Sequence, residues 1–383
     1  MTGQGAGLTA AIATVSIAGF GLSMTHPLIA LLLERAGASG LEIGLNAAAP
    51  AAAMLAGGLV MPRALRAVGA APLLLGACVT LAATLLLFKP LSGFGWWTAL
   101  RGLHGLAATA VFFASELWIV AVAPPERRGW LIGVYALCLS LGFLAGPLTL
   151  SLVGVEGWAP FLAAAGASLA AGAPVLWAWR AAPASLSAGP AKPPPVLLRM
   201  RTDPSLMLAV ALFGMIEFGG FALMPVWALG SGMDQDAALR VSAMLALGNV
   251  ALQLPLGWAA DRFDRRALLV GAAAISAAAA ALMGLSVGRV WAVMMWAALL
   301  GGVAVALYTV SLAELGARYQ GDALAGATGA VMMAYGFGAL IAPPLMGRAM
   351  DAAGPDGLLW TLGGAAGGYA LFAAWRARAR GAP

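Results

Sequence analysis

Apolar residues along this chain fall in long blocks that are separated by short polar segments. Most blocks approach or exceed the ~20 residues that a helix needs to cross ~30 Å of hydrocarbon. We therefore expect helices at residues 8–33, 42–66, 69–88, 93–122, 129–153, 158–180, 205–229, 238–260, 266–286, 290–315, 323–347 and 357–375. The pattern predicts an all-α membrane protein with twelve transmembrane helices.

The longest interruption of this pattern is residues 181–203, which read AAPASLSAGPAKPPPVLLRMRTD. Three consecutive prolines, with Ala, Ser and Gly, are typical of a linker rather than a helix. We predict an N-terminal six-helix bundle at 1–180, a cytoplasmic linker at 181–203 and a C-terminal six-helix bundle at 204–383.

Basic residues are distributed unevenly between the two sides of these helices. If both termini are cytoplasmic, fifteen Lys and Arg residues lie inside and five lie outside. This bias follows the positive-inside rule. The sequence thus predicts a multi-pass protein of a bacterial-type cell inner membrane, with both termini cytoplasmic.

Composition agrees with lipid as the main solvent. Of the 383 residues, 62% are hydrophobic and 9% are charged, whereas about 25% charged residues is typical of soluble domains. We attribute the net charge of +6 to the basic residues at the cytoplasmic ends of the helices, and we expect no nucleic acid partner.

Motifs of several other protein classes are missing from the sequence. The two cysteines, Cys78 and Cys138, lie in apolar blocks and form no CxxC pair, so we expect neither a disulfide framework nor a zinc site. We find no Walker lysine motif, no HExxH and no GxSxG. The chain is therefore predicted to be no enzyme and to need no cofactor, metal or ATP.

The two halves of the chain repeat one another. The first half contains G-x8-G-x3-G-P and the second contains G-x8-G-x3-A-P at a constant offset of 196 residues. The first motif consists of Gly133, Gly142, Gly146 and Pro147, and the second consists of Gly329, Gly338, Ala342 and Pro343. Gly69 similarly matches Asp264 at an offset of 195. A constant offset indicates a duplicated six-helix unit.

Several of these residues resemble signatures of the major facilitator superfamily. The stretch from Gly257 to Arg266, GWAADRFDRR, is similar to its loop signature G-x-L-A-D-r-x-G-r-r, with Asp264 in place of the second glycine. The copy between helices 2 and 3 is degenerate and keeps Gly69. Arg101 to Gly105 is similar to the R-x-x-x-G pattern of helix 4. The glycine run of helix 5 looks like the antiporter signature, but Leu150 and Ser151 replace its closing glycines.

This resemblance implies a secondary transporter in which two halves rock around a site at the membrane midplane. The spacing of Arg101, Glu116 and Arg128 is similar to that of the YcaD-like permease branch, for which no substrate is implied. By resemblance, the loop residues cap a helix end and pair across helices to hold one access state. With them we group other gating candidates, so that the predicted gate consists of Asp261, Arg262, Arg265, Arg266, Glu314, Gly146 and Pro147. The glycine run first serves close helix packing.

Glu217 is the main candidate for proton coupling. It lies near the middle of helix 7 in FGMIEFGGF, where an ionised group costs a few kcal/mol on insertion scales. Burial disfavours the charged carboxylate, which suits proton exchange. The alternative is a carboxyl that stays neutral or is bonded to a neighbouring helix.

Other ionisable groups are weaker candidates. Arg101 and His104 share a face of helix 4, where Arg101 either binds an anionic group or extends to the interface. His26 precedes Pro27 and can titrate near neutral pH, although a lone histidine in a helix is more often structural. Glu116 lies toward the inner end of helix 4 and favours a gating or structural role. His26 and Glu116 follow Glu217 as coupling candidates.

Neutral polar residues at membrane depth line a cavity or join helices. The predicted substrate-binding set consists of Arg101, His104, Asn249, Gln253, Tyr308 and Tyr335. The seventeen methionines are scattered, which favours flexible packing over soft-metal transport.

The leading functional prediction is proton-coupled efflux, an antiport, of a small amphipathic or cationic compound. Two transport alternatives remain open: proton-coupled uptake of a small anionic metabolite, for which Arg101 and His104 matter more, and transport of a metal ion. A non-transporting membrane receptor is the alternative from another class. The predicted partners are a small-molecule substrate, protons and the lipid bilayer, and the chain is expected to be a monomer.

Overall fold

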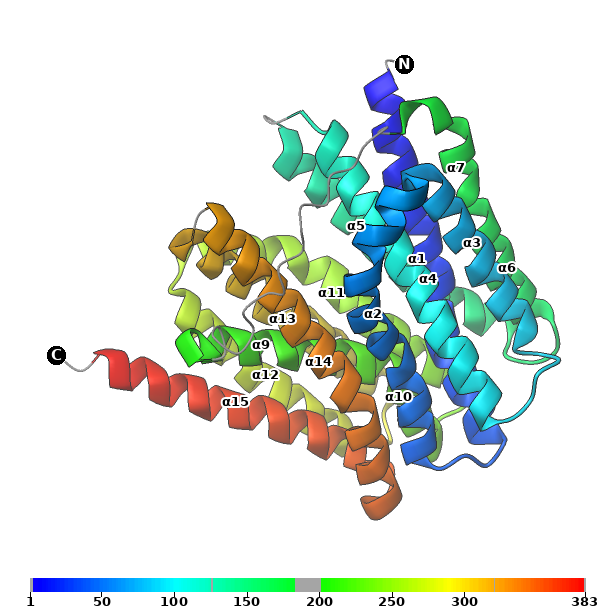
Figure 1. The fold of residues 1–383 in the computed structure, drawn as a ribbon. Helices are drawn as coiled ribbons and strands as arrows, with labels where there is room; N and C mark the ends of the chain where they lie inside the picture. The colour runs from blue at the N-terminus through cyan, green and yellow to red at the C-terminus, as the bar shows by residue number, and fades with distance from the viewer. Residues whose placement is uncertain (1–2, 125–126, 183–200, 320, 382–383) are drawn as a thin grey trace. The chain divides into compact units, whose positions relative to one another are not determined.

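The computed structural model of the chain describes residues 3–124, 127–182, 201–319 and 321–381 (Figure 1). Within these ranges the secondary structure is helical, without a strand. Twelve spans are long and apolar enough to cross a membrane. The predicted fold class, an all-α protein with twelve membrane-spanning helices, is confirmed.

Six spans occupy the N-terminal half. They are formed by α1 (Gly3–Arg35), α2 (Gly40–Val68), α3 (Ala70–Leu87), α4 (Phe94–Val122), α5 (Arg128–Val153), α6 (Ala159–Ala170) and α7 (Gly172–Trp177). The sixth predicted helix is thus divided into α6 and α7. Pro174 explains the division, because proline cannot donate to the carbonyl four residues earlier and its ring clashes with that carbonyl.

The other six spans follow residue 203. They are formed by α9 (Pro204–Gly214), a π-helix (Met215–Gly219), α10 (Gly220–Gly230), α11 (Gln235–Arg262), α12 (Arg265–Leu285), α13 (Val290–Arg318), α14 (Gly321–Ala353) and α15 (Gly357–Gly381). The seventh predicted helix therefore contains a π segment between α9 and α10, which form one span with it.

The chain divides into two compact units. The first contains Met1–Ile29 and Ala49–Lys192, and the second contains Ala30–Ala48 and Pro193–Pro383. The end of α1 and the start of α2 thus group with the second unit. Within that unit, the backbone N–H groups of Gly40 and Leu41 donate to the carboxylate of Asp351 at 2.6 and 2.9 Å. Most of the predicted linker lies outside the described residues.

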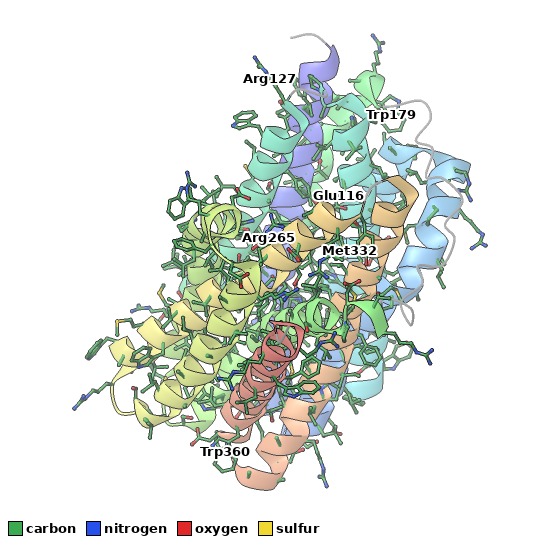
Figure 2. All side chains as sticks on the ribbon, turned by 90° about the vertical axis from the view of Figure 1, so that its left-hand side faces the viewer. Glu116, Arg127, Trp179, Arg265, Met332 and Trp360 are labelled. Atoms are coloured by element: carbon green, nitrogen blue, oxygen red, sulfur yellow. The ribbon has the colours of Figure 1, made fainter. Side chains whose placement is uncertain are left out.

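Tryptophans are exposed mainly near the ends of the helices. In the first unit Trp96 and Trp158 stand near the starts of α4 and α6. In the second unit Trp291 and Trp360 stand near the starts of α13 and α15, and Trp360, labelled in Figure 2 with Trp179, is 64% exposed. Tryptophan prefers the boundary between lipid and water, so these positions are consistent with membrane-spanning helices.

Equivalent glycines make equivalent contacts inside each unit. A Cβ atom on Gly142 would overlap the carbonyl oxygen of Ser16 on α1, and a Cβ on Gly338 would overlap that of Ala211 on α9. Ser16 and Ala211 are themselves 195 residues apart. The repeat seen in the sequence is therefore also a repeat of helix packing.

Candidate functional site

Glu217 lies in the π-helix Met215–Gly219, at the centre of the span that begins with α9 and ends with α10. A π-helix contains more residues per turn than an α-helix and is found frequently at functional sites. Just before it, Gly214 faces the backbone of α14, where a Cβ would overlap the carbonyl oxygen of Tyr335. A glycine is required here because the two helices approach so closely.

This close approach brings Glu217 and Tyr335 together. The hydroxyl of Tyr335 donates to Oε2 of Glu217 at 2.6 Å. The two residues are 118 positions apart in the chain. A hydrogen bond with an ionised partner is stronger than a neutral one, so this contact favours a carboxylate at position 217.

Glu217 also lines a small cavity in the second unit, where the space between the walls, open solvent included, is about 210 Å³. Its walls come from the α9–α10 span, α11 and α13. They are formed by Phe213, Ile216, Glu217, Phe221, Leu245, Asn249, Gly301 and Ala304. Glu217 is the only ionisable group among these lining residues, and Asn249 adds an amide.

Aromatic rings pack around Tyr335, the hydrogen-bond partner of Glu217. The ring of Tyr335 lies 5.8 Å from Phe213, 6.0 Å from Phe218 and 6.2 Å from Tyr308. The negative face of an aromatic ring attracts a cation within about 6 Å. The cluster therefore suits a positively charged group beside the carboxylate.

Two of the predicted substrate-binding residues lie at Glu217: Asn249 lines the same cavity, and Tyr335 donates to the carboxylate. A third, Tyr308, packs against Tyr335. Gln253 lies one turn beyond Asn249 on α11 and is not among the lining residues. Sequence reasoning missed Phe213 and Phe221. The signal was present, because both stand four residues from Glu217 and hence on the same helix face.

The other predicted site residues form a separate cluster in the first unit. Nη2 of Arg101 lies 3.0 Å from Nδ1 of His26. A guanidinium can only donate, so Nδ1 of His26 must accept and its proton belongs on Nε2. His26 is therefore neutral in this arrangement.

His104 is fixed by a different contact. Its Nδ1 lies 2.8 Å from Oγ1 of Thr84, whose hydroxyl donates to the carbonyl of Leu81 at 2.8 Å. Thr84 must then accept from Nδ1–H of His104. Nε2 of His104 is consequently an acceptor, and it is buried without a hydrogen-bond partner in the described part of the chain.

Glu116 makes a weaker contact than Glu217. The hydroxyl of Tyr135 on α5 lies 3.5 Å from Oε1 of Glu116, at the long limit of a hydrogen bond. Glu116, labelled in Figure 2, is exposed on α4. The two tyrosine–glutamate pairs therefore differ in length and in burial.

A helix cap lies in the loop between α11 and α12. Asp264, and not Asp261, caps α12, because its Oδ1 accepts from the backbone N–H of Ala267 at 2.7 Å. Asp264 stands where the superfamily signature has glycine, so a residue that departs from the signature provides the cap. Asp261 is exposed and has no hydrogen bond or ion pair among the described residues. Arg262 lies over the ring of Trp258, 4.2 Å from its centroid.

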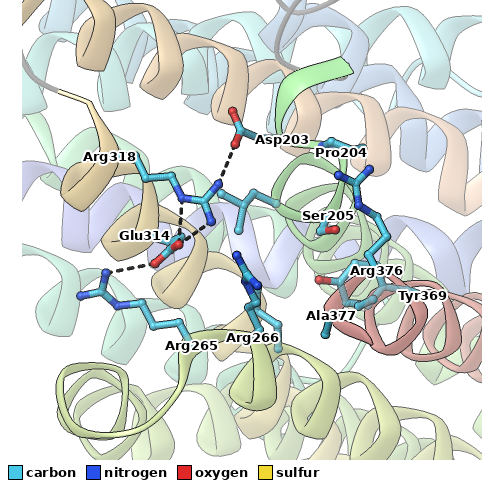
Figure 3. Close-up of a pocket in the computed structure, with 13 residues that line it drawn as sticks. Asp203, Pro204, Ser205, Arg265, Arg266, Glu314, Arg318, Tyr369, Arg376 and Ala377 are labelled. Atoms are coloured by element: carbon cyan, nitrogen blue, oxygen red, sulfur yellow. Dashed lines mark hydrogen bonds and ion pairs between the residues drawn. The ribbon is translucent and has the colours of Figure 1, made fainter. Parts of the chain in front are cut away.

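Ion pairs join the ends of α9, α12 and α13 (Figure 3). Arg265 contacts Glu314 at 3.1 Å, and Arg318 donates through Nε to the same carboxylate at 2.8 Å. Arg318 also contacts Asp203 at 2.8 Å. Pairing across helices is therefore present inside the second unit, and Arg265 and Glu314 are part of it.

Gly146 has a packing role in the first unit. A Cβ at this position would overlap the side chain of Ser23 and the backbone of Met24 on α1. Pro147 follows inside α5. In the described part of the chain no group of three or more His, Cys, Asp and Glu residues could hold a metal ion.

A family model and individual relatives agree on the type of protein that this chain resembles. The family model described as the Major Facilitator Superfamily matches residues 11–250 and 235–383. The uncharacterized MFS-type transporter YfkF of Bacillus subtilis (strain 168) is 28% identical over 277 residues, which cover 67% of this chain and 66% of that protein. An uncharacterized MFS-type transporter of Yersinia pestis (strain Pestoides F) is 22% identical over 259 residues, with the same coverage. The chain thus spans just under two thirds of either relative.

Solved structures show the same fold. The nucleoside transporter NupG has a TM-score of 0.72 and 14% sequence identity, with 99% of each chain covered. A D-xylose-proton symporter has a TM-score of 0.64 and 18% identity, covering 97% of this chain and 95% of the symporter.

Proposed function

The chain belongs to the Major Facilitator Superfamily, and on that premise we propose that it is a secondary transporter that exchanges protons for a small organic cation by alternating access. The observation that supports this proposal most directly is the 2.6 Å hydrogen bond from Tyr335 to Glu217 beside an aromatic-lined cavity. The YcaD-like branch remains a resemblance.

Proton coupling follows from the charge of this cavity. A carboxylate facing mostly apolar walls is costly without a positive partner. A bound proton removes the charge, and a bound cation compensates it. The two ligands therefore compete for one group, which is the linkage that antiport requires.

The walls of the cavity favour a cation over an anion. Phe213 and Phe221 contribute aromatic rings to these walls, and quaternary ammonium groups bind to aromatic cages. Asn249 offers an amide oxygen for a polar part of the substrate. An anion would be repelled by ionised Glu217.

The direction of transport rests on the proposed orientation, with both termini in the cytoplasm. An inward proton gradient then drives protons onto Glu217 from outside and expels the cation. We propose that Asp261, Arg262, Arg265, Arg266 and Glu314 act in the gate at the inner ends of the helices. Gly146 and Pro147 would contribute by allowing α5 to pack closely on α1.

A second candidate function is uptake of a small anionic metabolite. Arg101 is 2% exposed, and Nε of its guanidinium has no hydrogen-bond partner among the described residues. Its contact with neutral His26 supplies no negative charge, and no ion pair joins Arg101 to an acidic residue in the described part of the chain. A substrate carboxylate would compensate the positive charge. This alternative places the substrate in the first unit.

Binding of two simple ions separates the two candidates. Purified full-length protein is heated with tetraethylammonium or with benzoate, since a ligand of the folded state raises the unfolding temperature. The cation proposal predicts stabilisation by tetraethylammonium that is lost in Glu217→Gln. Stabilisation by benzoate alone, lost in Arg101→Gln, would overturn the cation proposal in favour of anion uptake.

Coupling is tested in reconstituted vesicles with an imposed proton gradient. Glu217→Gln keeps the shape of the side chain but cannot ionise, so uphill movement of tetraethylammonium should stop. Downhill movement should persist only at high tetraethylammonium concentration, because the affinity is reduced. Glu116→Gln is the matched comparison and should retain uphill transport. If Glu217→Gln still drove uphill transport at the wild-type rate, Glu217 would not be the coupling residue, and His26 or Glu116 would replace it.

A further inference from the structure

A second and larger cavity, with about 520 Å³ of space that includes the solvent at its opening, lies among the ends of four helices of the second unit (Figure 3). The start of α9 contributes Asp203, Pro204 and Ser205, and the end of α13 contributes Glu314 and Arg318. The start of α12 contributes Arg265 and Arg266, and α15 contributes Tyr369 and Arg376. This cavity is separate from the one that contains Glu217.

The cavity carries an excess of positive charge. Four arginines and two carboxylates line it. Both carboxylates are already engaged: Glu314 accepts from Arg265 and Arg318, and Asp203 accepts from Arg318, Thr202 and Tyr319. Two guanidinium charges therefore remain without an acidic partner in the cavity.

Arg266 and Arg376 are these remaining cations. Arg266 has neither a hydrogen bond nor an ion pair within the described ranges, and its side chain lines the cavity. The guanidinium of Arg376 lies 5.9 Å from the centre of the Phe372 ring, and its N–H groups make no hydrogen bond to another described residue. Figure 3 shows both side chains among the residues that line the cavity.

Tyr369 gives an independent indication of a ligand. Its side chain lines the cavity and is 6% exposed, and its hydroxyl is buried without a hydrogen-bond partner in the part of the chain that the structure describes. Buried hydroxyl groups are nearly always hydrogen-bonded. A ligand oxygen in the cavity would provide the missing partner.

We propose that this cavity binds a phosphate group. A guanidinium fork matches the oxygens of phosphate, and the hydroxyl of Tyr369 supplies one further donor. The helices α9 and α12 both begin at the cavity, so the positive ends of their dipoles add to the attraction for an anion. The phosphate belongs either to the headgroup of an anionic lipid or to a soluble phosphate compound.

Inorganic phosphate is the first probe. Purified full-length protein is heated with increasing phosphate at constant ionic strength, and wild type should be stabilised in proportion to occupancy. Arg266→Gln, Arg376→Gln and Tyr369→Phe should each weaken phosphate binding, the arginine changes by about tenfold or more. Arg289→Gln, at the exposed loop beyond the other end of α12, should bind like wild type.

Vesicles distinguish the two sources of phosphate. Protein is reconstituted in phosphatidylcholine alone or with phosphatidylglycerol, and its unfolding temperature is measured. Stabilisation by phosphatidylglycerol that Arg266→Gln and Tyr369→Phe abolish identifies a lipid headgroup, whereas stabilisation by added phosphate in phosphatidylcholine alone identifies a soluble ligand. If both variants responded like wild type to both probes, the proposal would be wrong.

Two controls exclude a loss of folding and damage to the cation site as explanations. Tyr369→Phe removes one oxygen without changing the shape of the ring, so a general loss of fold would not account for its effect. Arg376→Gln and Tyr369→Phe should keep the response to tetraethylammonium. Loss of that response in Glu217→Gln, with the phosphate response intact, would show that the two sites are independent.

Discussion

Arg101 donates a hydrogen bond to Nδ1 of His26 at 3.0 Å, and both side chains are buried in the first unit. Protonation of His26 at Nδ1 would place two donors against each other. This contact therefore favours a structural histidine over a proton carrier.

The contact can be tested by two changes at position 26. His26→Asn keeps an oxygen close to the position of Nδ1 and should leave stability nearly unchanged. His26→Leu removes the acceptor and should lower the free energy of unfolding by about 1.5–3 kcal/mol, the worth of a hydrogen bond to a charged group. Thermal unfolding in detergent measures both. Equal losses would mean that ring packing matters, and not the acceptor.

Removal of the Tyr335 hydroxyl should weaken cation binding. Tyr335→Phe keeps the ring and deletes the donor that stabilises ionised Glu217. The expected loss in tetraethylammonium affinity is about tenfold, corresponding to about 1.4 kcal/mol. Tyr369→Phe is the matched control and should bind tetraethylammonium normally. An unchanged affinity in Tyr335→Phe would argue against Glu217 as the cation's partner.

Binding of the cation should depend on pH through Glu217. As the medium is acidified, a larger fraction of the carboxyl is protonated, and affinity for tetraethylammonium should fall because the attracting charge is lost. In Glu217→Gln the affinity should be low at every pH. A binding titration at a series of pH values measures this, and a steep pH dependence in Glu217→Gln would assign the effect to another group.

The glycines of α5 should differ in their response to alanine. In Gly142→Ala the new methyl group would overlap the Ser16 carbonyl, and relief of the overlap should cost about 1–3 kcal/mol. In Gly133→Ala the methyl group meets open space, and the higher helix propensity of alanine should stabilise by up to about 1 kcal/mol. Unfolding temperatures of the two variants should therefore move in opposite directions.

Substitutions of Asp264 should lower stability, whereas substitution of Asp261 should impair transport. Asp264→Ala removes the cap of α12 and should cost about 1 kcal/mol, whereas Asp264→Gly should cost only a few tenths. Asp261→Asn should leave stability unchanged and impair transport by altering the balance of access states. Vesicle transport and thermal unfolding test both claims. Normal transport by Asp261→Asn would remove it from the gate.

The membrane fold could be predicted because hydrocarbon imposes a simple length rule. A block of about twenty apolar residues has few alternatives to a spanning helix, so the twelve spans follow from hydropathy alone. The division of the sixth helix could not be predicted from hydropathy. Pro174 lies within a continuous apolar block, and only the backbone geometry shows that the helix breaks before it.

The candidate site was predicted in part. Glu217 was identifiable from the cost of its charge in a membrane, but its contact with Tyr335 depends on glycine packing between helices distant in sequence. The phosphate cavity was missed because Tyr369, Arg376 and Arg266 belong to different helices, and each is unremarkable in its own segment. The resemblance implied that the loop residues cap a helix end but did not indicate which aspartate provides the cap, because capping depends on distance from the helix start.

The π-helix at Met215–Gly219 has a further consequence for the seventh span. An α-helix turns by about 100° per residue, and a π turn accommodates one residue more, so it sets the rotational phase of α10 relative to α9. The two segments face different partners within the second unit. Gly214 packs on α14, while Trp227 of α10 donates to Asp356, just before α15, at 3.0 Å. Deletion of one residue from the π segment would rotate one half of the span relative to the other and turn one of these two faces away from its partner. The span should therefore tolerate neither insertions nor deletions within this segment.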